Sequence, residues 1–459
     1  MDHLTRFKRD INGKTVGVVG IGVSNKPIIE MLAAMGVQVL AFDKRTVEQL
    51  GDTARELQEK GVHLFCGEDY MDHLTGDWII KTPGMRFDHP ALERAREKGS
   101  VITSEMELFF EYCPCPIVAV TGSDGKTTTT SLIYEMLSQG TQRVHLGGNI
   151  GFPLFCRLHG IQAEDLVVAE LSSFQLHTLR KSSHISVVTN LSPNHLDVHK
   201  DMAEYTEAKA NIFCYQSGED LLVLNADNEV TADFAKRAKG KVRMFSFLGD
   251  SGVPGAFYRD GAVYLRKEDG AVEKLIDRSE LKLRGNHNVE NFMAAVLAAM
   301  DYCTPAMIRK VAHEFGGVRH RMEFIRSVNG VQFYNDSIGS SPTRTIATLR
   351  SFDQKVRLIA GGYDKKIPYT VLGPVVADYV EKLYLCGATA EKIRDAVLAC
   401  DKEFAYEIYP NLKAATEAAY AESKDGDIVL LSPASASFDQ FKNFEERGDY
   451  FASVVEDLR

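Results

Sequence analysis

The chain has 459 residues, of which 44% are hydrophobic and 25% are charged, and its formal net charge is −10. This length predicts about three domains, and the apolar content excludes a chain that is mainly disordered. The acidic balance argues against a protein that finds nucleic acid through bulk electrostatics. An anionic substrate would need lysines and arginines concentrated where it binds.

The sequence predicts a reduced cytoplasmic protein that makes no use of a membrane. Its apolar stretches fall short of the roughly 18 residues of a membrane helix, and the opening MDHLTRFKRDINGKT lacks the apolar core of a signal peptide. Eight cysteines are too few for a disulfide framework in a chain this long. Cys113-Pro114-Cys115 lacks the two-residue spacer of a redox or zinc pair.

The first segment has the layout of a nucleotide-binding unit. An apolar strand at 16–19 runs into a Gly-x-Gly turn, a helical pattern over 27–35 and a second strand over 37–42 that ends at Asp43. Asn25 replaces the third glycine of the dinucleotide fingerprint, which is expected to loosen the packing of the helix on the strand. NAD, another nucleotide and a purely structural turn all stay open. A later strand at 77–80 precedes the turn Thr82-Pro83-Gly84, of the type that lines a crevice.

The second segment carries a phosphate-binding loop. An apolar strand at 117–120 leads into Gly122-Ser123-Asp124-Gly125-Lys126-Thr127-Thr128, and a helix follows to Leu137. Val120 occupies the place of the first glycine, so the loop is a shortened variant. Backbone amides at the helix start would face the phosphates, Lys126 would add a point charge, and Thr127 can hold magnesium. The alternative is a glycine-rich turn with an exposed lysine.

Three further features of this segment have open interpretations. The apolar run 165–170 ends at Glu170, which is either a magnesium ligand beside the phosphates or a strand leaving the core. His195, Asp197 and His199 alternate along the chain, and three interpretations stay open: a zinc site, a magnesium or phosphate role for one histidine, and a solvated loop. A helix is expected over 204–213 and carries Lys209. From the residues alone, Lys209 is interpreted as a lysine on the solvated face of this helix.

Later residues extend the same pattern. Asn288 stands before an apolar helix at 289–300, as an N-cap or as a hydrogen-bonding group for a base or ribose. Beyond Gly316-Gly317, strands at 331–334, 356–360 and 428–431 each end in a small polar turn. These alternate with helical stretches, which predicts a third α/β sheet with a ligand crevice at the strand ends.

The order of these motifs resembles the Mur ligases of peptidoglycan synthesis over the whole chain, and most closely those that add D-glutamate. The motifs include Gly147-Gly148-Asn149-Ile150-Gly151, the His195/Asp197 loop, His320-Arg321, Asn335-Asp336-Ser337 and the tail from 431 to 448. The resemblance implies an α/β protein of three domains. These are a Rossmann-like domain for the UDP-substrate at 1–108, a central ATP-binding domain of P-loop type at 109–317, and a Rossmann-like domain that contacts the amino acid and ATP at 318–459.

The activity that the resemblance implies is ATP-dependent amide-bond formation. ATP would phosphorylate the terminal carboxylate of UDP-N-acetylmuramoyl-L-alanine, and the amine of D-glutamate would attack the acyl phosphate. One or two magnesium ions would be required, and a monomer is expected. The alternatives are a related Mur or folylpolyglutamate-type ligase with another amino acid, an NAD-dependent dehydrogenase, and a non-catalytic nucleotide-binding protein.

The family also implies roles for individual residues. Lys126, His195 and Lys209 would be catalytic, with Thr127, Glu170 and His195 at magnesium and Lys209 carbamylated by carbon dioxide. The remaining ATP contacts would be Gly122, Ser123, Asp124, Gly125, Thr128, Asn288, Arg321 and Asp336. The UDP-substrate would meet Val23, Ser24, Asp43, Arg45, Thr82, Pro83, Gly84 and Asn149.

The expected D-glutamate pocket departs from the family pattern. Its residues would be Ser340, Lys365, Ser437, Phe438 and Phe444. Many members read Asn-Asp-Ser-Lys-Ala-Thr where this chain has Asn335-Asp336-Ser337-Ile338-Gly339-Ser340. Ser340 keeps a hydroxyl, but the lysine is Ile338, so Lys365 or Arg344 would have to supply the missing charge.

Overall fold

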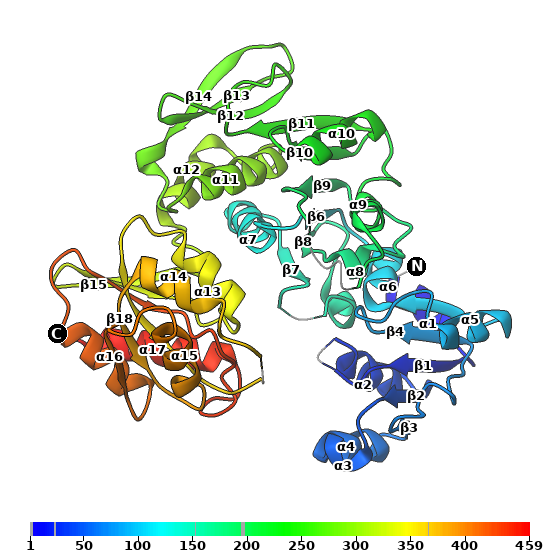
Figure 1. Cartoon of the computed structure of the whole chain (residues 1–459). Helices are drawn as coiled ribbons and strands as arrows, with labels where there is room; N and C mark the ends of the chain where they lie inside the picture. The colour runs from blue at the N-terminus through cyan, green and yellow to red at the C-terminus, as the bar shows by residue number, and fades with distance from the viewer. Residues whose placement is uncertain (1–2, 23, 152, 194–197, 366) are drawn as a thin grey trace. The chain divides into compact units, whose positions relative to one another are not determined.

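The computed structural model describes residues 3–22, 24–151, 153–193, 198–365 and 367–459. The chain divides into two compact units, Met1–Phe315 and Gly316–Arg459 (Figure 1). The first unit contains two sheets and the second unit a third. The α/β class with largely parallel sheets is therefore confirmed, whereas the boundaries of three domains stay a prediction. Among the described residues, no helix is long and apolar enough to cross a membrane.

The first sheet is parallel, with strand order β3-β2-β1-β4-β5. Its strands are β1 (Thr15–Val19), β2 (Gln38–Asp43), β3 (His63–Cys66), β4 (Trp78–Lys81) and β5 (Val101–Ser104). Its helices are α1 (His3–Ile11), α2 (Lys26–Ala34), α3 (Val47–Leu50), α4 (Asp52–Glu59), α5 (Pro90–Glu97) and α6 (Glu105–Tyr112). The strand order reverses between β1 and β4, which places the turns after these two strands at one crevice.

Asn25 keeps α2 fastened to the sheet. Its side-chain amide donates to the carbonyl of Val19 at 2.8 Å, and the residue is 1% exposed. The expectation that Asn25 loosens this packing is wrong, because a buried hydrogen bond replaces the close backbone approach that glycine allows.

The second sheet has nine strands in the order β14-β13-β12-β11-β10-β9-β6-β8-β7. Seven are parallel: β6 (Ile117–Thr121), β7 (Val144–Gly148), β8 (Leu166–Glu170), β9 (Ile185–Val188), β10 (Leu221–Asn225), β11 (Lys241–Ser246) and β12 (Gly255–Arg259). β13 (Ala262–Arg266) and β14 (Val272–Asp277) continue it antiparallel, as the ribbon at the top of Figure 1.

Helices cover the second sheet and join it to the first. They are α7 (Lys126–Leu137), α8 (Ser173–Leu176), α9 (Met202–Ala210), α10 (Glu229–Asp233), α11 (Asn286–Ala299) and α12 (Pro305–Glu314), with short 3-10 turns η1 (Phe155–Gly160), η2 (Phe234–Arg237) and η3 (Arg278–Glu280). α7, α11 and α12 pack on one face. The other face shares a hydrophobic core with the first sheet, where the rings of Phe7 and Phe155 meet edge to face at 4.9 Å. This common core makes residues 3–315 one unit.

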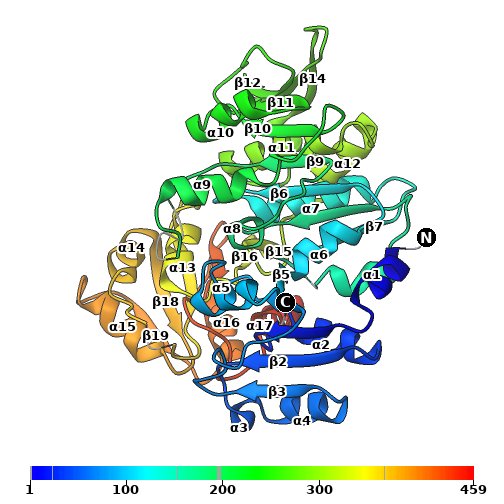
Figure 2. The same cartoon turned by 90° about the vertical axis from the view of Figure 1, so that its right-hand side faces the viewer.

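The third sheet has the order β15-β16-β20-β17-β18-β19. β15 (Glu323–Val328) is antiparallel to β16 (Val331–Asn335), and β17 (Val356–Ala360), β18 (Val380–Leu385), β19 (Tyr406–Ile408) and β20 (Ile428–Leu431) run parallel. One face carries α13 (Pro342–Leu349), α14 (Leu372–Tyr379) and α15 (Ala390–Leu398), and the other carries α16 (Leu412–Ala421) and α17 (Phe444–Asp457) (Figure 2). Because β20 lies between β16 and β17, the loops after these three strands are neighbours.

Candidate functional site

The phosphate loop joins β6 to α7 through two glycines that no other residue can replace without a shift. Gly122 has φ +148°, and a Cβ there would lie 1.9 Å from the hydroxyl of Thr189. Gly125, the residue before α7, has φ +76°, and a Cβ there would lie 2.2 Å from Oδ1 of Asn291. The loop is therefore pressed between the end of β9 and helix α11.

Residues that the sequence analysis missed hold the loop in place. The side chain of Asn190 accepts from the backbone amide of Asp124 at 2.9 Å, and its carbonyl accepts from the amide of Ser123 at 2.8 Å. The hydroxyl groups of Ser123 and Tyr205 are 2.9 Å apart. The only feature of the sequence that could have pointed to Asn190 is its place just after a parallel strand. For Tyr205 the sequence indicates only that it lies in a helix.

Lys126 folds back over its own loop. Its ammonium group donates to the carbonyls of Gly122 at 3.0 Å and Ser123 at 2.8 Å. Thr127 and Thr128 follow in the first turn of α7. An ammonium group and a helix N-terminus on one loop give the positive potential that a polyphosphate requires.

Lys209 is buried against the same loop, so the solvated-face interpretation is wrong. Its Nζ donates to Oγ1 of Thr121 at 3.1 Å and to the carbonyl of Gly122 at 2.8 Å, and the residue is 2% exposed. Burial, and then the nearby charge of Lys126, lower the pKa of Lys209 well below its ordinary value. The structure thus places an amine that readily loses its proton beside the phosphate loop.

Glu170 ends β8, which pairs with β6, and its partner in register is Val120. The residue is 1% exposed. One carboxylate oxygen accepts from the side-chain amide of Asn149 at 2.7 Å. The other oxygen is buried and has no hydrogen-bond partner among the residues that the structure describes. A buried, unpaired carboxylate oxygen is costly unless a cation meets it, so Glu170 fits the expected magnesium ligand.

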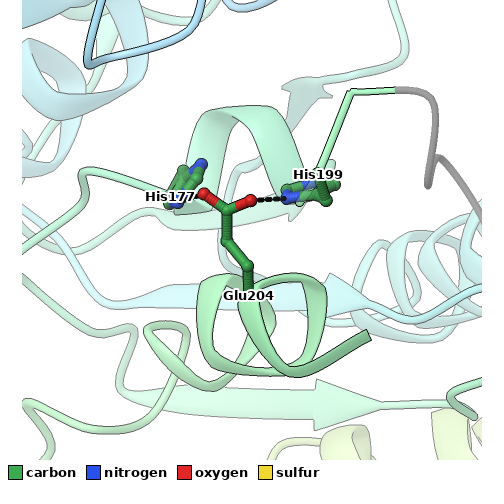
Figure 3. Close-up of side chains that lie close together, drawn as sticks. All are labelled: His177, His199 and Glu204. Atoms are coloured by element: carbon green, nitrogen blue, oxygen red, sulfur yellow. Dashed lines mark ion pairs between the residues drawn. The ribbon is translucent and has the colours of Figure 1, made fainter. Parts of the chain in front are cut away.

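The histidine motif is only partly described. His195 and Asp197 lie outside the described residues. His199 is buried and lies with His177 and Glu204, whose candidate ligand atoms are all within 4.8 Å of one another (Figure 3). However, the guanidinium of Arg86 already binds the Glu204 carboxylate at 2.9 and 3.3 Å. A divalent ion here would be repelled by that positive charge, so we do not assign this cluster as a metal site.

Five of the residues expected at the UDP-substrate line one cavity of about 310 Å³. They are Ser24, Thr82, Pro83, Gly84 and Asn149, and they are accompanied by Ser104, Glu105, Phe174 and Gln175, which the sequence analysis missed. A second cavity of about 340 Å³ shares Thr82 and Gly84 and is lined by Asp43 and Tyr70.

Asp43 also organises the turn after β1. Its carboxylate accepts from the backbone amides of Ile21 at 2.7 Å and Arg45 at 2.9 Å, and it pairs with the Arg45 guanidinium. Burial opposes ionisation, but these hydrogen bonds keep the pKa of Asp43 below its ordinary value. Arg45 in turn donates to the Ile21 carbonyl at 2.7 Å. Val23 lies outside the described residues.

Asn288 does not cap α11, so the N-cap prediction is wrong. The helix begins earlier, with Gly285 at the N-cap position, because the glycine accommodates φ +83°. Asn288 lies in the first turn, donates to the carbonyl of Arg284 at 2.7 Å and accepts from Asn291 at 3.0 Å. It therefore supports the residue that packs against Gly125.

In the second unit, Asp336 is enclosed at the end of β16. Its carboxylate accepts from the hydroxyl groups of Thr348 and Ser432, each at 2.7 Å. Burial raises the pKa of Asp336 to about 6. Arg321 is exposed, and its positive charge opposes this rise.

The residues expected at D-glutamate lie on adjoining segments of the second unit. The loops after β17 and β20 pair through the amide of Tyr363 and the carbonyl of Ala436 at 2.8 Å. Lys365 and Phe438 are exposed on these loops and Ser437 is buried. Ser340 and Phe444 are partly exposed on the loop after β16 and at the start of α17.

Arg447 of α17 fastens these loops together. Its buried guanidinium donates to the carbonyls of Ser337, Ser435 and Ala436 at 2.8 to 3.1 Å. Burial lowers the pKa of Arg447 to about 10.

The loop after β16 is also closely packed at Gly339, since a Cβ there would lie 2.6 Å from the Asp336 carboxylate. Arg344 is exposed and donates to the Ile338 carbonyl at 3.3 Å.

A parallel-sheet protein with a phosphate loop, a strand-end acid beside it and a buried lysine on it has the attributes of an enzyme that uses a nucleoside triphosphate. Three family models match in order: the Mur ligase MurD-like N-terminal domain at residues 14–104, the Mur ligase middle domain at 120–299, and the Mur ligase glutamate ligase domain at 320–435. The chain belongs to the Mur ligase family, whose members are ATP-dependent enzymes that form amide bonds. The resemblance predicted from the motifs is confirmed.

Curated relatives match the chain over its whole length. The UDP-N-acetylmuramoylalanine–D-glutamate ligase of Acetivibrio thermocellus is 51% identical, and the alignment covers 99% of both chains. The ligase of the same name from Clostridium kluyveri is 50% identical over 98% of both. Among solved structures, the UDP-N-acetylmuramate–alanine ligase of Thermotoga maritima is 17% identical with a TM-score of 0.58, covering 97% of this chain and all of that one, which shows a shared fold.

Proposed function

We propose that the protein joins D-glutamate to UDP-N-acetylmuramoyl-L-alanine, with ATP as the energy source, in peptidoglycan precursor synthesis. The observation that carries this proposal is the identity of about half of all residues, over 99% of both chains, with a ligase of that name. The phosphate loop, the unpaired carboxylate oxygen of Glu170 and the buried Lys209 support the proposal, because they would supply the chemistry that the reaction needs. We further propose a cytoplasmic monomer with the domain boundaries expected from the sequence.

The reaction needs cations more than it needs a covalent nucleophile. A carboxylate is a poor electrophile until the γ-phosphoryl group of ATP is transferred to one of its oxygens, which releases ADP and gives an acyl phosphate. The amine of D-glutamate then attacks the acyl carbon and loses a proton, and the tetrahedral intermediate expels phosphate to leave the amide. Lys126 would stabilise the charge that builds up during phosphoryl transfer.

Magnesium, when bound, would neutralise charge on the phosphate oxygens. Glu170 would hold it through its unpaired carboxylate oxygen, with Thr127 from the first turn of α7 as a second ligand. The proposed contribution of His195 rests on the family motif alone.

Lys209 has the properties of a lysine that carbon dioxide can modify. Its lowered pKa favours the neutral amine, which can attack carbon dioxide, forming a C–N bond and releasing one proton. The product is a carbamate anion, which would be attracted to the positive charge of Lys126 and would help to hold a second magnesium ion. Mass spectrometry of the intact protein under carbon dioxide should show the added mass of CO2, absent in Lys209→Ala. Full activity of Lys209→Ala without an added carboxylate would refute the carbamate.

The substrate contacts remain proposals taken from the family. Ser24, Asp43, Arg45, Thr82–Gly84 and Asn149, with Val23, would bind the UDP-substrate, and the shared cavity lining of five of them supports this. Asn288, Arg321 and Asp336 would contact the adenosine side of ATP. Ser340, Lys365, Ser437, Phe438 and Phe444 would contact D-glutamate, with Lys365 or Arg344 replacing the charge absent at Ile338.

The test is phosphate release from ATP with UDP-N-acetylmuramoyl-L-alanine, magnesium and bicarbonate present. D-Glutamate, L-glutamate, D-aspartate, L-lysine and no amino acid are compared. We expect release only with D-glutamate. Release with another amino acid would support a ligase of different specificity. This is the second candidate function, because Ile338 replaces the lysine of the family pattern. Nucleotide binding without any acceptor-dependent release would indicate a non-catalytic protein.

A further inference from the structure

Arg86 connects the turn after β4 with helix α9. It follows Thr82–Gly84, and the backbone amide of Met85 in between donates to the Thr82 carbonyl at 3.1 Å. The Arg86 guanidinium binds the Glu204 carboxylate at 2.9 and 3.3 Å and donates to the carbonyl of Val198 at 2.6 Å. Asp88 holds its other edge through two hydrogen bonds of 2.8 Å. Arg86 is thus fixed in one orientation between two carboxylates.

Glu204 lies inside a packed group of side chains. His177 and His199 approach its two oxygens at 3.4 and 3.9 Å (Figure 3). The Arg86 hydrogen bonds lower the pKa of Glu204 to about 2, and burial lowers the pKa of His177. The arginine therefore balances the charge of the ionised Glu204 carboxylate, and the lowered pKa of His177 favours its neutral ring.

The same group reaches three parts of the phosphate site. His199 stacks on Phe174 at 5.4 Å and meets the ring of Tyr205 edge to face at 5.3 Å. Its Nε2 lies 2.9 Å from the hydroxyl of Ser173, three residues beyond Glu170. Tyr205 contacts Ser123 of the phosphate loop and lies 4.9 Å below the amine of Lys209.

We propose that Arg86 is a positioning residue that couples occupancy of the UDP-substrate cavity to the phosphate site through Glu204 and helix α9. The inference rests on the proposed function. Because Arg86 follows the turn Thr82–Gly84 and its guanidinium is bound to Glu204, a precursor that holds this turn also restrains Glu204 and thereby the helix that carries Tyr205 and Lys209. Binding energy gained at the nucleotide end of the precursor is then used to organise the centre where phosphate is transferred.

The experiment measures, by calorimetry, the affinity for a non-hydrolysable ATP analogue with magnesium, with and without UDP-N-acetylmuramoyl-L-alanine. The ratio of the two dissociation constants is the coupling factor. We expect a factor of about five or more in the wild-type protein, the lower end of measured couplings. It should fall towards one in Arg86→Gln and in Glu204→Gln, with intermediate coupling in Arg86→Lys. Because the pair acts as a unit, the double variant should lose no more than either single one.

Arg96→Gln is the matched control, because Arg96 pairs with Glu93 on the surface of α5 and should leave the factor unchanged. Unfolding temperatures show whether each variant is folded. An unchanged factor in both Arg86→Gln and Glu204→Gln, or a wild-type factor of one, would overturn the inference while acceptor-dependent phosphate release still supports the proposed function. A lower unfolding temperature with no change in coupling would assign Arg86 a structural role only. A wild-type protein that does not bind the precursor would overturn both proposals.

Discussion

Gly125 is one of two closely packed glycines in the phosphate loop, and replacing it with alanine tests whether that packing sets the affinity for ATP. The new Cβ would lie 2.2 Å from Oδ1 of Asn291, at a residue with φ +76°. The left-handed backbone costs alanine about 1 kcal/mol. Moving Asn291 away would also break its hydrogen bonds with Thr129 and Asn288, each worth about 1 kcal/mol.

If the loop shifts to relieve this strain, its geometry for nucleotide binding is lost and the affinity for ATP decreases. About 3 kcal/mol corresponds to roughly a hundredfold loss in kcat/KM for ATP. Gly13→Ala is the control, because Gly13 has φ +70° and no described atom within 4 Å of the added Cβ. It should cost about 1 kcal/mol of stability and leave kcat/KM unchanged. In Gly125→Ala/Asn291→Ala the clash is removed, and at least about tenfold of the loss should return.

The assay is steady-state phosphate release at varied ATP, with thermal unfolding followed in parallel. The reasoning is refuted if Gly125→Ala matches Gly13→Ala in both measurements, or if Asn291→Ala restores nothing. Either result would mean that the loop accepts a Cβ at this place without losing its geometry.

Three further predictions concern other sites. Lys126→Ala should abolish phosphate release, a loss of about a thousandfold or more, at an unchanged unfolding temperature, and near-normal activity would contradict its role at the phosphates. Glu105 is buried, accepts from the amide of Phe155 at 2.7 Å, and burial raises its pKa to about 7. Because the folded state then binds a proton that the unfolded state releases above about pH 4.5, the contribution of Glu105 to stability is lost as the pH rises to about 7. Glu105→Gln should therefore gain stability relative to the wild-type protein between pH 5 and pH 8 in thermal unfolding, and a pH-independent difference would contradict the raised pKa. Gly339→Ala should destabilise the second unit by about 1–3 kcal/mol and lower its unfolding temperature, whereas Gly218→Ala, with no described atom within 4 Å of its Cβ, should not.

The sequence predicted those parts of the fold whose signals are local. Apolar runs followed by glycine turns identified β1 and β6, and an apolar run that ends in an acid identified β8. The phosphate loop lies where its motif predicts. The antiparallel β13 and β14 were not predicted, since their residues include exposed polar positions without a clear alternation.

What the sequence could not supply is the set of contacts between distant segments. Lys209 looks like an ordinary helical lysine, and its burial depends on packing against a loop more than 80 residues earlier. Arg86 and Glu204 are separated by 118 positions, and neither lies in a recognisable motif. The prediction that Asn288 caps its helix was wrong because the helix begins earlier, after Gly285. Such pairings are decided by tertiary packing, which local sequence patterns do not predict.

The position of β20 has a consequence for synthesis on the ribosome. This strand is the last of the chain, yet it fills the gap between β16 and β17, and Arg447 lies later still. While residues 316–427 emerge, β16 and β17 lack the neighbour that joins them, so their backbone edges stay open to other chains. The first unit, complete by residue 315, can fold during translation, whereas the second must wait for almost its whole length. Slow or interrupted translation before β20 is made would therefore expose an unfinished sheet, and premature termination there would leave the loops after β16 and β17 without their neighbour while the phosphate loop of the first unit is intact.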